Sequence, residues 1–369
     1  MVVSSTAAKQ PPLVVHLIYC LDTGGLERVM LNCIRGMANQ GFRHAVVSLT
    51  HATSFANQLP ADVPVYCLGK KPGADLSVHL KLWRLLRDLR PAILHSYNLA
   101  TLEYHPVSWL AGVRGHFHAE HGRDVSDPKG NNKKYQWLRR LISPFVQRYI
   151  AVSDDLNQWL LQQVRLPKSK VQLIYNGINT DNFNPTAAKS AGFNFIHVAR
   201  LAPIKDQATL IAAFVLLRQQ STLPCRLLLV GDGPLRQTLQ QQAMDSGIGE
   251  HIEFLGERQD IAALMQQSQV FVMSSLSEGI PMTILEAMAC SLPIVATAVG
   301  GIPELIQANH GTLVAAKSPA ALANAMQLYL EQPELAASQG QLCRLRVCEK
   351  FSEPAMVAQY LSLYRAVRL

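Results

Sequence analysis

A short apolar strand, a helix with a distinctive entrance and a second apolar strand follow one another in the second half of the chain. The apolar runs 270–273 and 293–299 have the composition of buried parallel strands. Gly279 permits a close backbone approach, and Pro281 suits the first position of a helix because its φ is already helical and it has no N–H to leave unpaired. Residues 282–290 are mostly helix-forming and apolar, so we predict a buried helix there. A strand, a helix and a strand in this order predict a parallel α/β fold.

Two carboxylates flank the entrance of this predicted helix. Glu278 and Glu286 stand eight positions apart, the first just before the glycine and the second inside the helix. The free N–H groups and the dipole at the start of a helix favour an anion, most naturally a phosphate. A carboxylate beside a phosphate is not there to bind it, so we expect both glutamates to accept hydrogen bonds from hydroxyl groups on either side. Phosphates flanked by hydroxyls describe a sugar nucleotide.

The whole segment carries a resemblance to a known family. Glu278 and Glu286 with Gly279 and Pro281 between them, followed by Gly-Gly-Ile-Pro-Glu at 300–304, resemble the nucleotide-sugar signature of retaining glycosyltransferases of the GT-B fold, family 4. The resemblance implies an α/β protein with two Rossmann-like doubly wound domains that face each other across a cleft. It also implies a C-terminal helix that crosses back to the first domain.

The length of the chain supports two domains, because 369 residues exceed what one hydrophobic core usually organises. The polar stretch 186–192 is a plausible interdomain linker. With the resemblance, we expect residues 1–188 and 352–369 to form an acceptor-side domain. Residues 189–351 would form the nucleotide-sugar-binding domain.

Cysteine usage and hydropathy indicate a cytoplasmic protein. The seven cysteines are scattered and show neither metal-ligand spacing nor a disulfide pattern, so we expect them to be core residues in a reducing compartment. No apolar run approaches the roughly 20 residues that span a bilayer. No Asp-x-Asp motif is present. We therefore expect no catalytic metal and no other cofactor.

Basic residues are concentrated in the first half of the chain. The first 189 residues contain 22 Lys and Arg against 12 Asp and Glu. Residues 132–148 join cations with aromatic and aliphatic side chains at helical spacing, so this helix lies on an anionic membrane surface or turns its apolar stripe inward. The first alternative places the protein at the inner face of the plasma membrane, with Lys133, Lys134, Arg139 and Arg140 as contacts. No recognition motif supports a nucleic-acid partner.

Two segments of the first half match the family at the ends of predicted strands. The apolar run 13–20 ends at a turn with Gly24 and Gly25 before a helical stretch, which is the opening unit of a doubly wound sheet without the spacing of dinucleotide binders. The resemblance implies that this turn faces the donor phosphates and the acceptor. His121 follows another predicted strand, where ligands bind in open sheets, and the resemblance implies contact with the donor sugar. His118 is the alternative.

The second half supplies the remaining predicted contacts. Arg200 and Lys205 are a bidentate donor and a point cation that would offset the charge of a departing diphosphate. The resemblance implies that Glu286 holds the ribose hydroxyls, while Glu278 and His121 hold the sugar hydroxyls. The other residues expected at the nucleotide sugar are Gly231, Arg258, Gly279, Ile280, Met282 and Thr283.

These features predict a metal-independent retaining hexosyltransferase. It would move a hexosyl unit from a nucleotide-diphosphate sugar, a UDP-sugar in preference to GDP-mannose, to a saccharide or lipid-linked acceptor in exopolysaccharide or cell-surface glycan biosynthesis. Glu278, His121, Arg200 and Lys205 would carry the catalysis. The alternatives are an inactive sugar-nucleotide-binding subunit of a polysaccharide assembly complex and a sugar-nucleotide epimerase of GT-B shape. An oxidoreductase is disfavoured because the dinucleotide fingerprint is missing.

Overall fold

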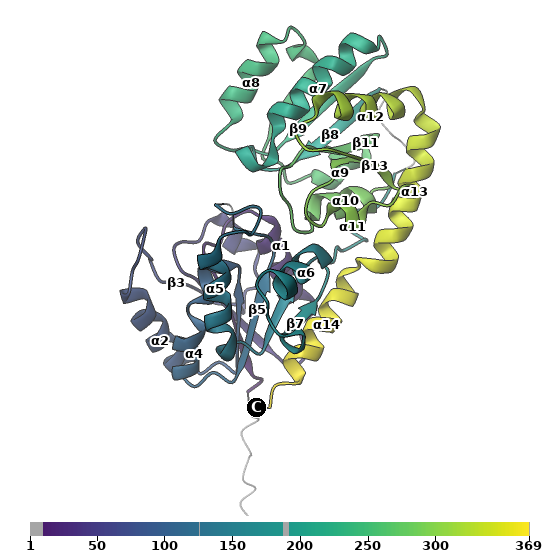
Figure 1. Cartoon of the computed structure of the whole chain (residues 1–369). Coiled ribbons are helices and arrows are strands. Elements are labelled where there is room, and N and C mark those ends of the chain that lie inside the picture. Colours follow the sequence, from purple (N-terminus) through teal and green to yellow (C-terminus); the bar gives the residue numbers. More distant parts are fainter. Residues whose placement is uncertain (1–9, 125, 187–191, 369) are drawn as a thin grey trace, which may run out of the picture.

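The protein is built from two parallel α/β domains, one above the other in Figure 1. The computed structural model describes residues 10–124, 126–186 and 192–368. The first sheet has seven strands in the order β3-β2-β1-β4-β5-β6-β7, and the second has six in the order β10-β9-β8-β11-β12-β13. All neighbouring strands are parallel. The predicted fold of two Rossmann-like domains is confirmed.

The first domain alternates strands with helices. Its strands are β1 (Leu13–Ile18), β2 (Arg43–Ser48), β3 (Val65–Cys67), β4 (Ile93–Tyr97), β5 (Gly115–Glu120), β6 (Arg148–Ala151) and β7 (Val171–Leu173). Its α-helices are α1 (Gly25–Gly36), α2 (Ser77–Leu89), α3 (Leu99–Leu102), α4 (His105–Leu110), α5 (Lys133–Ile142) and α6 (Asp154–Gln162). Short 3-10 helices are η1 (Ser54–Gln58), η2 (Ser143–Phe145) and η3 (Lys168–Lys170).

The second domain repeats the alternation and ends in two long helices. Its strands are β8 (Phe193–Val198), β9 (Cys225–Val230), β10 (Ile252–Gly256), β11 (Val270–Met273), β12 (Ile294–Thr297) and β13 (Gly311–Val314). Its helices are α7 (Gln207–Gln220), α8 (Arg236–Asp245), α9 (Ile261–Gln266), α10 (Met282–Ala289), α11 (Ile302–Leu305), α12 (Pro319–Glu331) and α13 (Pro333–Lys350), with η4 (Pro203–Lys205) and η5 (Gly249–His251). The last helix is α14 (Glu353–Arg365).

The strand order of each sheet reverses at one point. In the first sheet β1 lies between β2 and β4, and in the second β8 lies between β9 and β11. Ligands in open α/β sheets bind outside the carboxyl ends of the strands at such a point. The loop after β1 carries Gly24 and Gly25, and the loop after β8 carries Arg200. The topology therefore puts predicted site residues of both domains at these two positions.

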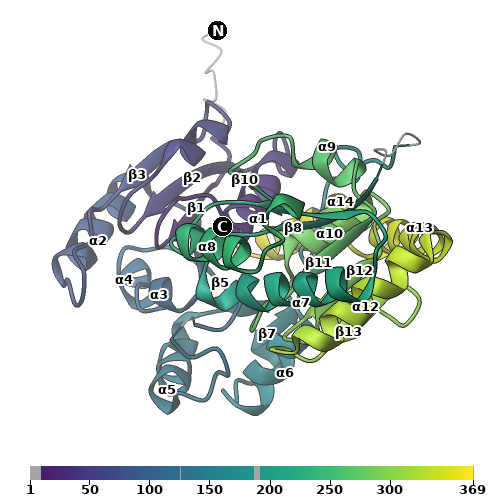
Figure 2. The ribbon, with the colours of Figure 1, turned by 90° about the horizontal axis from the view of Figure 1, so that it is seen from above.

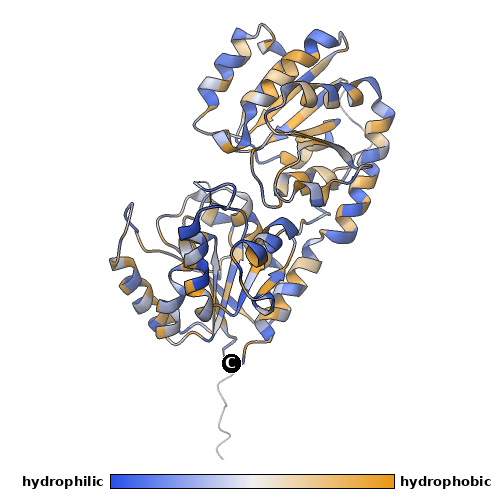
Figure 3. Ribbon diagram, in the orientation of Figure 1, coloured by the Kyte–Doolittle hydropathy of each residue, from blue (hydrophilic) through white to orange (hydrophobic). Residues whose placement is uncertain are grey.

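The strands contain the most hydrophobic segments of both domains (Figure 3). All six residues of β1 are buried. Val15 and Leu17 pack in one core cluster with α2, while Val14 and Ile18 pack with α1 on the other side of the sheet. A strand covered on both faces needs apolar side chains at every position, which explains the continuous run that predicted it.

The first sheet also buries several histidines. The His16 Nδ1 lies 2.8 Å from the Tyr97 hydroxyl, and the His16 Nε2 lies 3.0 Å from the His44 Nδ1. The His95 Nδ1 lies 2.6 Å from the Tyr364 hydroxyl of α14. Burial lowers the pKa of His16 and His95, and it lowers the pKa of His44 to about 4. These rings are therefore neutral hydrogen-bonding groups of the core at physiological pH.

The C-terminal helices join the two domains, and the predicted return to the first domain is confirmed. α13 and α14 run along one side of the molecule in Figure 1, and Figure 2 shows α13 at the edge of the second domain. Ile178 and Ser352 pair where the chain passes between the domains, with Ile178 N donating to Phe351 O at 2.9 Å and Glu353 N donating to Ile178 O at 3.0 Å. α14 then packs on α1, where Val357 leaves no room for a side chain at Gly36.

Arg139 contradicts the expectation that it is an exposed cation of the segment 132–148. Its side chain is buried, and its Nε and Nη2 donate to the carboxylate of Glu120 at 2.6 and 3.1 Å. The physical reason is that Glu120, the last residue of β5, points into the interior and needs a counter-charge there. Arg140 donates to the carbonyl oxygens of Val164 and Gln163. Lys133 and Lys134 are exposed.

Two segments of the first domain differ from what the sequence pattern suggests. Residues 99–111 have the apolar pattern of one helix but form α3 and α4, because Pro106 in the first turn of α4 lacks the N–H that would continue the first helix. The helix expected over 132–148 ends at Ile142, just before Pro144. Most of the predicted linker 186–192, with the boundary between residues 188 and 189, lies outside the described residues.

Candidate functional site

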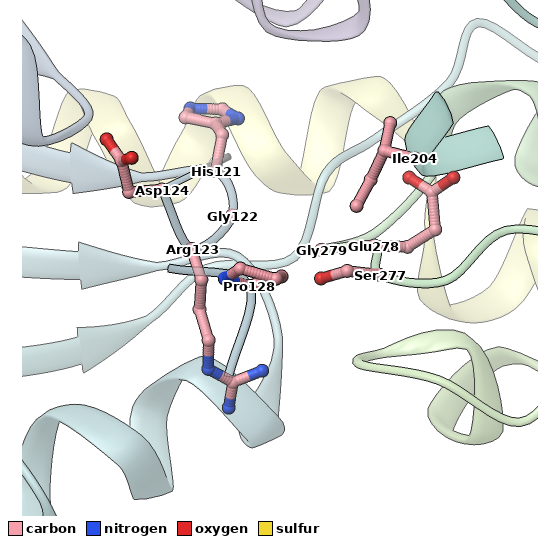
Figure 4. Close-up of a pocket in the computed structure, with 9 residues that line it drawn as sticks. All are labelled: His121, Gly122, Arg123, Asp124, Pro128, Ile204, Ser277, Glu278 and Gly279. Carbon is pink, nitrogen blue, oxygen red and sulfur yellow. The ribbon is translucent and has the colours of Figure 1, made fainter. Parts of the chain in front are cut away.

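Three of the predicted site residues, His121, Glu278 and Gly279, line one pocket between the two domains (Figure 4). The pocket has a volume of about 170 Å³. The loop after β5 forms one wall, and the loop after β11 forms the other together with Ile204 of η4. The complete lining is His121, Gly122, Arg123, Asp124, Pro128, Ile204, Ser277, Glu278 and Gly279.

Glycines allow the two loops to approach. A Cβ atom at Gly279 would collide with the carbonyl oxygen of His121 in the other domain. Gly300 adopts φ +54° beside the backbone of Glu278 and also has no room for a side chain. α10 then begins at Met282, where the predicted helix 282–290 begins, and Pro281 is its N-cap instead of its first helical residue. The expected close backbone approach is thus an approach to the opposite domain.

Glu278 forms an ion pair with Lys205. The Lys205 Nζ donates to the Glu278 Oε1 at 2.5 Å, and the Ser275 Oγ donates to the same oxygen at 2.6 Å. Ser274 Oγ bonds the Lys205 carbonyl oxygen at 2.9 Å, which links η4 to the loop after β11. The two predicted residues are therefore brought together, and no donor from the described part of the chain reaches the second carboxylate oxygen of Glu278.

Arg200 faces the first domain. Its side chain is exposed at the end of β8, and it lies near enough to Cys20 for its charge to act on that thiol. Burial, Glu27 and Asp22 raise the pKa of Cys20, while Arg200 opposes them. The charge of Arg200 thus acts on the segment of the first domain that precedes Gly24 and Gly25.

The start of α1 closes the site from the other domain. A Cβ atom at Gly25 would lie 3.8 Å from the Cγ of Met282, so the glycine-rich turn touches the start of α10. Glu286 is buried inside α10, and burial raises its pKa to about 7, while Arg28 of α1 opposes this shift. Burial also raises the pKa of Glu27 to about 7. Both carboxyls are therefore partly protonated near neutral pH.

His121 directly follows β5 and borders the pocket. Its backbone N–H donates to the Asn98 Oδ1 at 2.8 Å, and its ring lies 5.7 Å from the ring of Tyr97. Burial lowers its pKa to about 4, and within the described residues its Nε2 is buried without a partner. The alternative, His118, bonds to Ser96 and Glu120 inside the domain. The neutral ring of His121 therefore offers one unpaired nitrogen to a ligand hydroxyl.

The nucleobase side of the predicted site is only partly assembled. Gly231, at φ +127°, lies against Ala199 O, and its N–H donates to Gly256 O at 2.8 Å. Arg258 donates to both carboxylate oxygens of Asp260 at 2.8 and 2.6 Å on the surface after β10. Arg258 is thus engaged locally and is not among the residues that line the pocket.

The backbone at the start of α10 offers hydrogen-bond donors. The N–H groups of Ile284 and Leu285 bond to Pro281 O, whereas no acceptor is present for Met282 or Thr283 among the described residues. The Ile280 carbonyl oxygen, by contrast, accepts from the Asn176 Nδ2 of the first domain at 3.0 Å. In the part of the chain that the structure describes, no three His, Cys, Asp or Glu side chains converge as a metal site would require.

Sequence reasoning missed four residues around the site. Ser275 and Asn176 bind Glu278 and the Ile280 carbonyl directly, and Arg28 supplies the charge near Glu286. Glu304 was noticed only as the end of a motif. The only sequence signal for Ser275 and Asn176 was position, because Ser275 follows a predicted strand and Asn176 precedes a predicted turn. Position does not reveal that Asn176 bonds a residue 104 positions away.

A second, larger pocket lies away from this site. It has a volume of about 710 Å³ and is lined by segments 10–13, 90–92 and 111–112. The cations in its wall are Arg43, Arg87, Arg90 and Arg114, and none of the described residues that line it is acidic. It lies where strands β1, β2 and β5 begin, at the edge of the sheet opposite to the site loops.

Models of two families match the chain, one for each domain. The model described as Glycosyltransferase Family 4 matches residues 23–182, and the model described as Glycosyl transferases group 1 matches residues 179–344. Together they account for most of the chain.

Curated relatives and solved structures give the same picture. N-acetyl-alpha-D-glucosaminyl L-malate synthase of Bacillus anthracis is 30% identical over 258 residues, 66% of each protein. UDP-Gal:alpha-D-GlcNAc-diphosphoundecaprenol alpha-1,3-galactosyltransferase of Escherichia coli is 27% identical over 65% of this chain and 66% of that protein. The chain thus matches about two thirds of the length of these relatives. HepE of Anabaena with UDP and glucose has a TM-score of 0.84 at 21% identity, over 96% of this chain and 100% of that one, and shares the fold.

Proposed function

The chain belongs to the family 4 glycosyltransferases of the GT-B fold, and from this premise we propose that it transfers a hexosyl unit from a nucleotide-diphosphate sugar to a saccharide or lipid-linked acceptor. One observation carries the proposal. Lys205 and Glu278 are paired at the interdomain pocket, opposite the unpaired nitrogen of His121. A phosphate-binding cation and two groups that bind hydroxyls are the elements that a sugar diphosphate needs.

The donor diphosphate would lie between Arg200, Lys205 and the N-terminus of α10. The free N–H groups of Met282 and Thr283 and the helix dipole favour an anion there. When the phosphate attracts Lys205, Glu278 loses its cation and becomes available to a sugar hydroxyl. Glu286 would accept hydrogen bonds from the ribose diol. A UDP-sugar is favoured because the named E. coli relative uses UDP-galactose and HepE binds UDP, although other relatives are named for GDP-mannose.

The transfer would proceed with retention of configuration on one face of the sugar. The acceptor hydroxyl oxygen bonds to the anomeric carbon while the bond from that carbon to the phosphate oxygen breaks. The hydroxyl proton passes to the departing phosphate. Glu278 is not the nucleophile in this scheme, because it accepts a hydrogen bond from a sugar hydroxyl and a double displacement needs a pair of carboxylates at defined spacing. Arg200 and Lys205 would stabilise the negative charge of the leaving group, so that no metal is required.

Ligand-dependent thermal stability tests this proposal. Any ligand that binds only the folded state raises its melting temperature. We expect UDP and one UDP-sugar to stabilise the protein equally with and without EDTA, and Glu286→Ala to abolish the effect. Glu349→Ala, a change at an exposed glutamate of α13, is the matched control and should keep it. No shift with UDP-sugars or GDP-mannose would contradict the proposal. A shift without sugar transfer to any acceptor would favour the inactive sugar-nucleotide-binding subunit, and interconversion of a UDP-sugar without an acceptor would favour the epimerase.

We also propose that one face of the first domain contacts an anionic membrane. Twelve large apolar side chains are exposed among the described residues, and seven of them lie in or beside α2, α4 and α5. They are Leu76, Leu80, Trp83, Trp109, Leu110, Trp137 and Leu141. α2 contacts α4, and Trp109 of α4 packs on Phe145 just after α5, so the three helices form one continuous surface. Exposed tryptophans beside cations are typical of proteins that lie on a membrane surface.

The charges around this surface agree with an anionic partner. Arg84 and Arg87 of α2 and Lys133 and Lys134 of α5 are exposed. The basic pocket begins directly after Leu110, so its arginines could receive lipid phosphates. No helix among the described residues is long and apolar enough to cross a bilayer. Contact would therefore be with the surface of the membrane, which would bring a lipid-linked acceptor near the protein.

Vesicle binding tests the membrane proposal. The variant Trp109→Ser/Trp137→Ser/Lys133→Gln/Lys134→Gln should lose sedimentation with phosphatidylglycerol vesicles, while the wild type binds these and not phosphatidylcholine vesicles. Met244→Ser/Leu345→Ser removes two exposed apolar side chains of the second domain and should bind as the wild type does. Equal binding by the first variant and the wild type would contradict the proposal.

A further inference from the structure

A carboxylate of the second domain caps a helix of the first. Glu304 lies in α11, and its two carboxylate oxygens accept from the backbone N–H groups of Asp154 at 2.6 Å and Asp155 at 2.8 Å. These are the first two residues of α6. The capped end and the capping residue are thus 150 positions apart in sequence and belong to different domains.

α6 already has its own N-cap. Ser153 accepts from the Leu156 N–H at 3.1 Å, as an N-cap residue should. Asp154 and Asp155 also place two carboxylates in the first turn, where they favour the helix dipole. The Glu304 carboxylate is a third negative charge at this end and is repelled by the other two. The stability of α6 therefore does not require Glu304.

The backbone around Glu304 is held by its own domain. Arg346 of α13 donates to Glu304 O and Leu305 O, both at 2.8 Å. Gly301 N donates to Gly279 O at 3.1 Å, and a Cβ atom at Gly301 would collide with Gly279 and with Ser153. The segment that carries Glu304 is thus in direct contact with the donor loop on one side and with the start of α6 on the other.

We infer that Glu304 is a positioning residue, which orients the second domain on α6 and thereby holds the donor loop against His121. Gly279 of this loop touches His121 O, so a small rotation between the domains would change the distance between Glu278 and the His121 ring. Asn176 holds the same loop through Ile280 O and is a further hydrogen bond between the domains. The effect on turnover rests on the proposed transferase function, whereas the effect on domain orientation does not.

Hydrogen exchange and solution scattering test the inference without a substrate. In Glu304→Ala, exchange at the Asp154 and Asp155 amides should rise at least about tenfold, because these amides lose their acceptors. The radius of gyration obtained from the scattering curve should increase. Glu304→Gln keeps one acceptor oxygen and the side-chain shape, so it should show a smaller change and provides a second variant if the alanine variant does not fold. Glu349→Gln is the matched control.

Kinetics separate a positioning role from a local cap. We expect Glu304→Ala to lower kcat/KM about tenfold while the Kd for UDP changes less than about twofold, because UDP contacts mainly the second domain in the proposed binding mode. Faster exchange with unchanged scattering and unchanged kcat/KM would reduce Glu304 to a local cap and overturn the inference. Unchanged exchange would also overturn it. If the wild type transfers no sugar, exchange and scattering still decide the role of Glu304, while the proposed function fails separately.

Discussion

Replacing Arg139 by methionine should destabilise the first domain strongly. The change leaves the Glu120 carboxylate buried without its counter-charge, because the carboxylate is fully buried and, among the described residues, its only other ion-pair partner is His118. Removing one partner of a buried ion pair costs about 3–5 kcal/mol. Burial opposes ionisation of Glu120, but Arg139 and then His118 outweigh it and lower its pKa from 4.5 to about 2. At about 1.4 kcal/mol per pKa unit, this corresponds to about 3 kcal/mol.

Urea unfolding followed by tryptophan fluorescence measures this effect in the right domain. All four tryptophans, at positions 83, 109, 137 and 159, lie in the first domain, and the Arg139 guanidinium stacks 4.8 Å from the Trp159 ring. Arg139→Met should lower the free energy of unfolding by about 3–5 kcal/mol at pH 7. Lys134→Met, an exposed change on the same helix, should alter it by less than about 0.5 kcal/mol. The double variant Glu120→Gln/Arg139→Met should recover most of the loss, since it removes the uncompensated charge.

The pH dependence of the same difference provides a second check. The pKa of Glu120 is lower in the folded state, so the stabilisation by the pair is present above pH 4.5 and is lost as the pH falls toward 2. In Arg139→Met the carboxyl can protonate at higher pH, so the gap between variant and wild type should narrow on acidification. A loss below about 1 kcal/mol at pH 7, or a gap independent of pH, would refute the reasoning.

Three further predictions concern the site and the histidines. Glu278→Gln should lower kcat by about 100-fold with an unchanged melting temperature, because an amide oxygen is a weaker acceptor for the sugar hydroxyl than a carboxylate. Normal turnover would rule out this role of Glu278. Burial raises the pKa of Glu286 to about 7, and if only the carboxylate binds the ribose, UDP affinity should fall about tenfold from pH 8 to pH 6. Calorimetry should find no such slope in Glu286→Gln, and a flat wild-type profile would contradict the assignment. Burial lowers the pKa of His44, His121 and His197 to about 4 each, so the unfolded state binds more protons and the urea midpoint should fall as the pH drops from 6.5 toward 4. A constant midpoint over this range would show that these rings stay neutral when unfolded or are not buried.

Some features could not be recognised from local sequence. α13, the longest helix, buries Ala336, Gly340, Cys343 and Val347, which are small or scattered and form no strong apolar stripe. Gly340 is needed because it packs on Ser291 O, and this contact exists only in the folded domain. The break between α3 and α4 is indicated by Pro106, but the apolar pattern continues across it.

The sequence by itself determined the elements whose signals are local. The apolar runs, the glycines and Pro281 predicted β11, α10 and β12 to within one or two residues, because propensity and burial on both faces act between near neighbours. The family resemblance extended these elements to a two-domain fold.

Tertiary structure alone decided the partners of charged residues. In the sequence alone, Arg139 is one more cation of a basic helix. Only the packing of α5 against the end of β5 places it beside Glu120. In the sequence alone, Glu304 is the last residue of a glycine motif. Only the contact between the two domains brings it to the start of α6. A charge can be paired or solvated with equal ease in an extended chain. Its role depends on which distant group the folded chain brings within hydrogen-bonding distance.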